Sequence, residues 1–140
     1  MKTLQTLTTA LLIAFSSFAF ADGPDASKLK MDYALNAYIN ALSSGSIKGL
    51  AEVLDKDVKY TISRGEGIVT LNRSQILELF KSYENIEQNC TTTQSIIEAG
   101  DNQTIVKINM KYEAFSKVNF VTLNNTPKGW KITNISTTYN

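Results

Sequence analysis

The sequence predicts an α+β fold: three helices from the N-terminal half, packed in a strongly curved, mostly antiparallel sheet. Two observations support this prediction. Apolar residues recur at helical spacing in three segments before residue 85, and after it they alternate with polar residues as strands do. Helices segregated from a mostly antiparallel sheet define the α+β class. If the sheet curls around the helices, the result is a cone-shaped barrel with an open mouth.

Two helices are expected before residue 58. The first begins near Lys28 and ends at Gly45, because glycine commonly forms the left-handed C-cap of a helix. Ser46 is the expected N-cap of the second helix, which ends at residues 55–57. The apolar faces consist of Met31, Ala34, Leu35, Tyr38, Ala41 and Leu42 in the first helix, and of Ile47, Leu50, Val53 and Leu54 in the second.

A short hairpin and a third helix are expected next. Residues 58–63 alternate as a strand does, Gly65 and Gly67 bracket a tight turn, and residues 68–71 return as a second strand. Asn72, with Gln75 three residues later, predicts a capping box at the start of the third helix. Its apolar stripe consists of Ile76, Leu77, Phe80 and Tyr83.

Four longer strands complete the predicted sheet. They span about 88–98, 106–113, 117–123 and 130–139, with a hairpin turn at 100–102 and a loop at 124–129. Lys107, Lys111 and Lys117 are expected on the solvent face. The aromatic and sulfur-containing residues expected to face inward are Tyr60, Met110, Tyr112, Phe120 and Trp130.

Residues 1–21 have the pattern of a bacterial signal peptide. Lys2 precedes an apolar stretch, and Ala19-Phe20-Ala21 matches a signal-peptidase site with cleavage before Asp22. The apolar stretch is shorter than the roughly 20 residues that span a bilayer. We therefore expect an exported, periplasmic or secreted protein, not held in a membrane after cleavage, with one domain at residues 22–140.

Charge and composition exclude several functions. The 13 basic and 13 acidic residues after position 21 balance, so the clustered positive charge of a nucleic-acid-binding protein is not expected. Histidine is absent, which excludes a His-based triad or a His-containing metal site, and we predict neither a metal nor a cofactor. The single cysteine, Cys90, is either buried or paired between molecules, and we favour burial.

The sequence resembles the nuclear transport factor 2-like superfamily, whose cystatin-like fold is a curved-sheet cone. The resemblance extends from about Lys30 to Tyr139 and depends on two scaffold motifs. Residues 38–50 (YINALSSGSIKGL) are similar to the superfamily's helix pair, and residues 129–132 (GWKI) are similar to the start of its last strand. Within the superfamily the chain is most similar to small exported members described as lumazine-binding-like or polyketide-cyclase-like.

The resemblance implies that the catalytic residues of related enzymes are absent. The oxyanion-stabilising tyrosine of ketosteroid isomerase falls on Tyr38, but its general base falls on Ile62 and its second acid near Ser116. Neither residue can replace a carboxylic acid. Dehydratase-type members need histidine. Epoxide-hydrolase-type members need an Asp-Arg-Asp group, and the acid nearest to Arg64, Glu66, lies in a turn that is expected to face water.

We therefore favour a non-catalytic domain that binds a small, partly apolar molecule in the cone or forms a dimer. The resemblance implies a homodimer formed through the sheet. The alternative is an isomerase- or cyclase-type enzyme that uses Tyr38 with an acid or base not identified in the sequence. No catalytic residue is predicted. The residues expected to line the cone are Tyr38, Tyr60, Ile62, Phe80, Met110, Tyr112, Phe120 and Trp130.

Overall fold

The computed structural model describes residues 26–140. The predicted signal peptide, residues 1–21, and the first residues of the predicted mature domain lie outside this range. Within it, no helix is both long enough and apolar enough to cross a bilayer.

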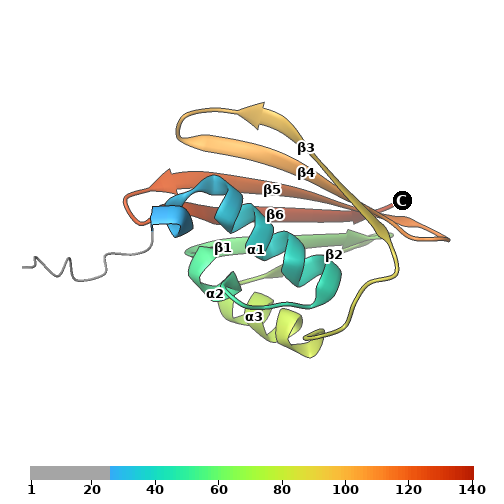
Figure 1. Cartoon of the computed structure of the whole chain (residues 1–140). Helices are drawn as coiled ribbons and strands as arrows, with labels where there is room; N and C mark the ends of the chain where they lie inside the picture. Colours follow the sequence, from blue (N-terminus) through green and yellow to red (C-terminus); the bar gives the residue numbers. More distant parts are fainter. Residues whose placement is uncertain (1–25) are drawn as a thin grey trace, which may run out of the picture.

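Three α-helices and a six-stranded sheet form the predicted α+β cone, and the sheet curls around the helices without closing (Figure 1). The strand order is β2-β1-β6-β5-β4-β3, with β1 and β6 parallel and every other neighbouring pair antiparallel. The elements are the 3₁₀ helix η1 (Ala26–Leu29), α1 (Met31–Ser44), α2 (Leu50–Val53), β1 (Leu54–Arg64), β2 (Gly67–Leu71), α3 (Arg73–Ser82), β3 (Thr91–Ala99), β4 (Gln103–Lys111), β5 (Ser116–Thr126) and β6 (Gly129–Tyr139).

One apolar core fills the space between the helices and the inner face of the sheet. Strand β4 shows the expected alternation, with Thr104, Val106, Ile108 and Met110 buried and the residues between them more exposed. Helix α1 covers this face with the apolar stripe predicted for it. The fully buried side chains of greatest volume are Tyr38, Tyr60, Leu50, Ile76, Ile108, Met110, Leu123, Ile132 and Ile135.

The capping box of α3 is formed as predicted. The Gln75 amide N–H donates to Asn72 Oδ1 at 3.0 Å, and the Asn72 amide N–H donates to Gln75 Oε1 at 2.9 Å. These two bonds satisfy donors that the first turn of a helix otherwise leaves unpaired. They fix where β2 ends and α3 begins.

Several predicted boundaries were wrong. The second helix is four residues long and is capped by Gly49 rather than Ser46, and residues 55–57 belong to β1. The β1–β6 register is irregular between Leu54 and Lys59, the part of β1 that contains these charged residues. The predicted loop at 124–129 is only a tight turn at 127–128, because β5 and β6 remain paired to Thr126 and Gly129.

The strand predicted at 88–98 begins at Thr91, so Cys90 lies just before β3. Its thiol is half-buried, with Sγ 3.7 Å from Thr92 Oγ1. The expected burial of Cys90 is therefore partial, with the side chain packed against the edge of the core.

The C-terminus of α1 is joined to the loop after α3 through Gly45. Gly45 has the left-handed conformation predicted for a C-cap, with φ of 71°. Its carbonyl accepts a hydrogen bond from the Asn85 amide N–H at 2.9 Å, and the Gln88 amide N–H donates to the Ser43 carbonyl at 2.7 Å. A Cβ at position 45 would lie 2.5 Å from the Tyr83 carbonyl oxygen, so glycine is required for the close approach of the two backbones.

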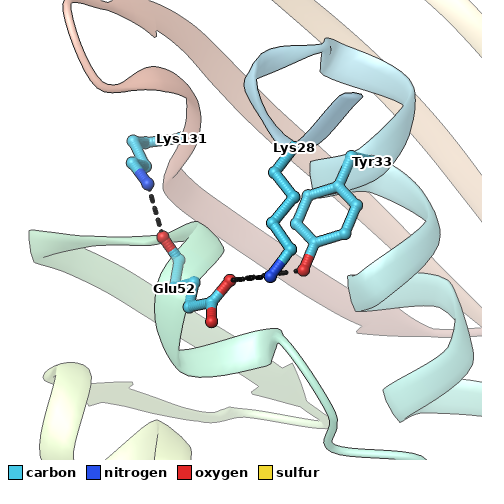
Figure 2. A network of polar contacts seen from close by, with 4 residues as sticks. All are labelled: Lys28, Tyr33, Glu52 and Lys131. Carbon is cyan, nitrogen blue, oxygen red and sulfur yellow. Dashed lines mark hydrogen bonds and ion pairs between the residues drawn. The ribbon is translucent and has the colours of Figure 1, made fainter. Parts of the chain in front are cut away.

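A surface network connects η1, α1, α2 and β6 at Glu52 (Figure 2). The Tyr33 hydroxyl donates to Glu52 Oε2 at 3.3 Å, and Lys28 Nζ lies 3.8 Å from the same oxygen. Lys131 Nζ donates to the Glu52 backbone carbonyl at 2.5 Å. The Lys28 and Glu52 side chains are 46% and 58% exposed, so water screens their ion pair and the network orients these elements more than it stabilises them.

We predict that Gly45→Ala destabilises the protein far more than Gly65→Ala. Both glycines have positive φ, but a Cβ at Gly65 meets no atom within 4 Å. Gly65→Ala should therefore cost only the left-handed strain, about 1 kcal/mol, whereas Gly45→Ala adds a clash with backbone and should cost about 2–5 kcal/mol. Urea unfolding of both variants measures the difference, and equal losses would contradict the backbone contact.

Candidate ligand-binding site

A cavity of about 300 Å³ opens between the helices and one end of the sheet. It lies where β1 and β6 end and β5 begins, near the loop after α3 and the C-terminus (Figure 1). This volume is at the lower end of the range for small-molecule sites, about 300–1,000 Å³. The residues that line it are Ala41, Leu42, Tyr60, Ile62, Arg64, Leu79, Phe80, Tyr83, Ile86, Gln88, Tyr112, Phe115, Lys117 and Tyr139.

Aromatic rings form one wall of the cavity. Tyr112 and Phe115 stack with ring centroids 4.5 Å apart and planes 12° apart. Phe115 also packs against Tyr139, with centroids 6.0 Å apart. A flat apolar molecule fits such a wall because aromatic rings prefer offset-stacked or edge-to-face contacts.

Tyr112 also links this wall to the loop after α3. Its hydroxyl donates to Gln88 Oε1 at 2.7 Å. Burial, followed by the nearby Cys90, raises the pKa of Tyr112 to about 12. The phenol therefore stays neutral at physiological pH and remains a hydrogen-bond donor at the cavity rim.

A buried polar network adjoins the cavity at Tyr60. The Thr137 hydroxyl donates to Asn119 Oδ1 at 2.6 Å and lies 3.1 Å from the Tyr60 hydroxyl. Asn119 Nδ2 lies 3.9 Å from Met110 Sδ. Burial is the main reason that the pKa of Tyr60 is raised to about 12. The network holds the Tyr60 ring against the cavity and satisfies polar groups that would otherwise be costly to bury.

Two cations line the cavity. The Arg64 guanidinium lies over the Tyr139 ring, 5.2 Å from its centroid, which is a cation–π contact. Lys117 is half-buried on β5, and burial lowers the pKa of its ammonium. The lining residues include neither aspartate nor glutamate.

Tyr38 lies in the core, outside the lining residues. Its ring packs edge-on against Phe80, with centroids 5.8 Å apart. Its hydroxyl is buried near Tyr60 but forms no hydrogen bond of good geometry among the described residues. Burial, followed by the neighbouring Tyr60, raises the pKa of Tyr38 well above its usual value.

The structure brings only half of the residues expected in the cone to the cavity. Tyr60, Ile62, Phe80 and Tyr112 line it. Tyr38 and Met110 are fully buried in the core. Trp130 is half-buried against the core at the opposite end of β6 from Tyr139.

The inward orientation predicted for Phe120 was wrong, and so was the outward orientation predicted for Lys117. On β5 the buried inner positions are Asn119, Val121 and Leu123, so Phe120 faces outward and is 37% exposed. Lys117 has the same parity as the inner positions and lines the cavity. The apolar residues at 118, 120, 121 and 123 are compatible with either set of alternating positions facing inward. The structure shows that the set containing Asn119 faces inward, whereas an asparagine in a strand is normally expected to face solvent.

Sequence reasoning also missed Arg64 and the lining residues of the loop after α3. Arg64 is exposed beside the β1–β2 turn, as expected, but its guanidinium lines the cavity and lies over the Tyr139 ring. Tyr83, Ile86 and Gln88 reach the cavity because the loop is held at Gly45. The sequence predicts Gly45 as a left-handed C-cap, but it does not indicate that the backbone of the loop after α3 bonds to it.

A curled, unclosed sheet around three helices, with a cavity at its open end, is the cone of the nuclear transport factor 2-like fold. The sequence pattern of the family described as putative lumazine-binding matches residues 27–138, so the chain belongs to that family. No curated protein is significantly similar to it in sequence.

Solved structures share the fold at low sequence identity. An NTF2-like protein from Methylobacillus flagellatus has a TM-score of 0.61 and 17% identity, with 86% of this chain and 96% of that chain covered. One from Silicibacter pomeroyi has a TM-score of 0.62 and 10% identity, covering 78% and 92%. A protein from Parabacteroides distasonis described as a putative ketosteroid isomerase has a TM-score of 0.56 and 16% identity, covering 78% and 86%.

We predict opposite effects of removing the two buried tyrosine hydroxyls. Tyr38→Phe removes an unpartnered buried hydroxyl, so the free energy of unfolding should be unchanged or rise by up to about 1–3 kcal/mol. Tyr60→Phe breaks the contact with Thr137 and should lower it by about 1 kcal/mol. Urea unfolding of both variants provides the test, and a large loss of stability in Tyr38→Phe would mean that its hydroxyl is bonded.

Proposed function

We propose that this chain is an exported, non-catalytic domain that binds a small, partly apolar molecule in the cavity at the open end of the cone. The observation that carries the proposal is the cavity itself, about 300 Å³ with mostly apolar and aromatic lining and a few polar groups. Small-molecule sites share this composition. Membership of a family named for lumazine binding is compatible with the proposal.

Two observations favour binding over an isomerase- or cyclase-type reaction. The residues that line the cavity include no carboxylate that could serve as general base. The Tyr38 hydroxyl, which such a reaction would use, is buried in the core and not among the lining atoms. A molecule in the cavity would contact Tyr60, Ile62 and Phe80 instead.

Export is supported by the leader pattern at residues 1–21. A domain acting outside the cytoplasm would collect its ligand from the periplasm or the medium. An open-mouthed cavity suits such a role because the ligand enters without unfolding the cone.

We also propose that the domain forms a homodimer through the outer face of the sheet. The helices lie on the other face (Figure 1). Phe120 is 37% exposed on the outer face, between its strand partners Lys107 and Ser136. A second copy placed on this face would bury the phenylalanine and leave the cavity open.

We predict that filling the cavity abolishes binding. Ile62→Trp enlarges a half-buried lining residue and should occupy the space of the ligand. Val69→Trp is the matched control, because Val69 is the strand partner of Ile62, is 55% exposed and does not line the cavity. Native mass spectrometry of protein purified from the exported fraction should find a stoichiometric small molecule on wild type and Val69→Trp only.

The same three proteins should be titrated with 2-naphthamide, a neutral planar probe, by calorimetry. Wild type and Val69→Trp should bind one molecule, and Ile62→Trp should bind about tenfold more weakly or not at all, which corresponds to about 1.4 kcal/mol. A wild-type protein that carries no ligand and binds neither 2-naphthamide nor its anionic analogue 2-naphthoate would contradict the proposed function.

We predict that Phe120→Lys converts a dimer to a monomer. A charge in place of the exposed ring would have to be buried between the two copies, which is unfavourable without a partner. Ile68→Lys, on the 70% exposed position of β2, is the control and should remain dimeric. Sedimentation velocity measures both, and a monomeric wild type would exclude the dimer.

A further inference from the structure

The cavity concentrates positive charge in a chain that is otherwise balanced. After position 21 the sequence has 13 basic and 13 acidic residues. The lining has two cations, Arg64 and Lys117, and no acidic residue. The salt bridges among residues 26–140 join Lys28 to Glu52 and Lys56 to Asp57, so neither lining cation has a carboxylate within 4 Å.

Lys117 occupies a position where its charge is unfavourable without a partner. It is on the inner face of β5, two residues before the fully buried Asn119. Burial lowers the pKa of its ammonium, and the nearby Cys90 offsets part of this effect. A partly desolvated ammonium without a counter-ion is costly, and a negatively charged ligand would offset that cost through a charge-assisted hydrogen bond.

Arg64 is the second cation at the cavity. Its guanidinium packs over the face of Tyr139, 5.2 Å from the ring centroid. A cation–π contact uses none of the guanidinium's N–H donors as hydrogen bonds, and these donors match the two oxygens of a carboxylate. Tyr139 therefore holds Arg64 at the cavity without using its hydrogen-bonding capacity.

Aromatic and aliphatic side chains form most of the remaining lining, and Gln88 is a further polar residue. The stacked pair Tyr112 and Phe115, with Tyr139 beside it, forms a ring wall next to the two cations. Leu79, Phe80 and Ile86 also line the space. A small inorganic anion would leave this surface unfilled, and a neutral apolar molecule would leave both cations unpaired.

We infer that the cavity binds a planar aromatic anion, whose ring packs on the Tyr112–Phe115–Tyr139 wall and whose carboxylate pairs with Lys117 and Arg64. This inference rests on the proposed function, because it names the class of ligand for the same cavity. The carboxylate supplies the charge that the lining lacks, and the ring fills the apolar space.

The test compares two probes of the same shape, 2-naphthoate and the neutral 2-naphthamide, by calorimetry on wild type, Lys117→Met, Arg64→Gln and Lys111→Met. Lys111 is the matched control because it is an exposed lysine at the end of the neighbouring strand β4, outside the lining. Thermal unfolding of each variant verifies that it is folded. Lys117→Met should fold at least as stably as wild type, because it removes an unpaired charge.

Wild type and Lys111→Met should bind 2-naphthoate about tenfold or more tightly than 2-naphthamide, the effect of a charge-assisted hydrogen bond. Lys117→Met should lose that preference while keeping its affinity for 2-naphthamide, and Arg64→Gln should reduce the preference. Equal binding of the two probes by wild type would overturn the anion inference and leave the proposed function intact. Binding of neither probe would contradict both, and displacement of 2-naphthoate by inorganic phosphate at similar concentration would show that the site recognises charge without the ring.

Discussion

The cavity depends on one backbone contact, between the end of α1 and the loop after α3. Because Gly45 has no Cβ, the Tyr83–Ile86 backbone can approach it, and the Asn85 amide N–H donates to its carbonyl. Helix α1 supplies Ala41 and Leu42 to the cavity, and the attached loop supplies Tyr83, Ile86 and Gln88. The same contact therefore fixes the position of the cavity wall from α1 relative to the wall from the loop after α3, and it requires glycine at position 45.

The buried polar network around Asn119 sets the orientation of β5, which forms another side of the cavity. Asn119 faces inward because Thr137 donates a hydrogen bond to its side-chain carbonyl and Met110 Sδ lies near its amide nitrogen, both on the inner face of the sheet. Since successive side chains of a strand point to opposite faces, an inward Asn119 also turns Lys117 inward and Phe120 outward. The inward position of Asn119 therefore places the Lys117 ammonium at the cavity and the Phe120 ring on the outer face.

Features that depend on local chemistry could be predicted from the sequence. Gly45 as C-cap, the Asn72–Gln75 capping box and the alternation of β4 each follow from neighbouring residues. The parity of β5, the attachment of the 83–88 loop and the position of Arg64 over Tyr139 depend on partners distant in the sequence. This is why the fold class could be predicted from sequence, whereas only half of the expected cone residues line the cavity.

Several lining residues, among them Ala41, Tyr60 and Phe80, also belong to the apolar core, but the charged lining residues do not. The core is closed by side chains such as Ile108, Leu123 and Ile132, none of which lines the cavity. The charged lining positions, Arg64 and Lys117, lie near strand ends and contribute little to that core. Solved structures at 10–17% identity therefore keep the cone without determining what occupies it. In this chain an ammonium and a guanidinium beside stacked rings give the cavity a chemical character that the apolar core lacks.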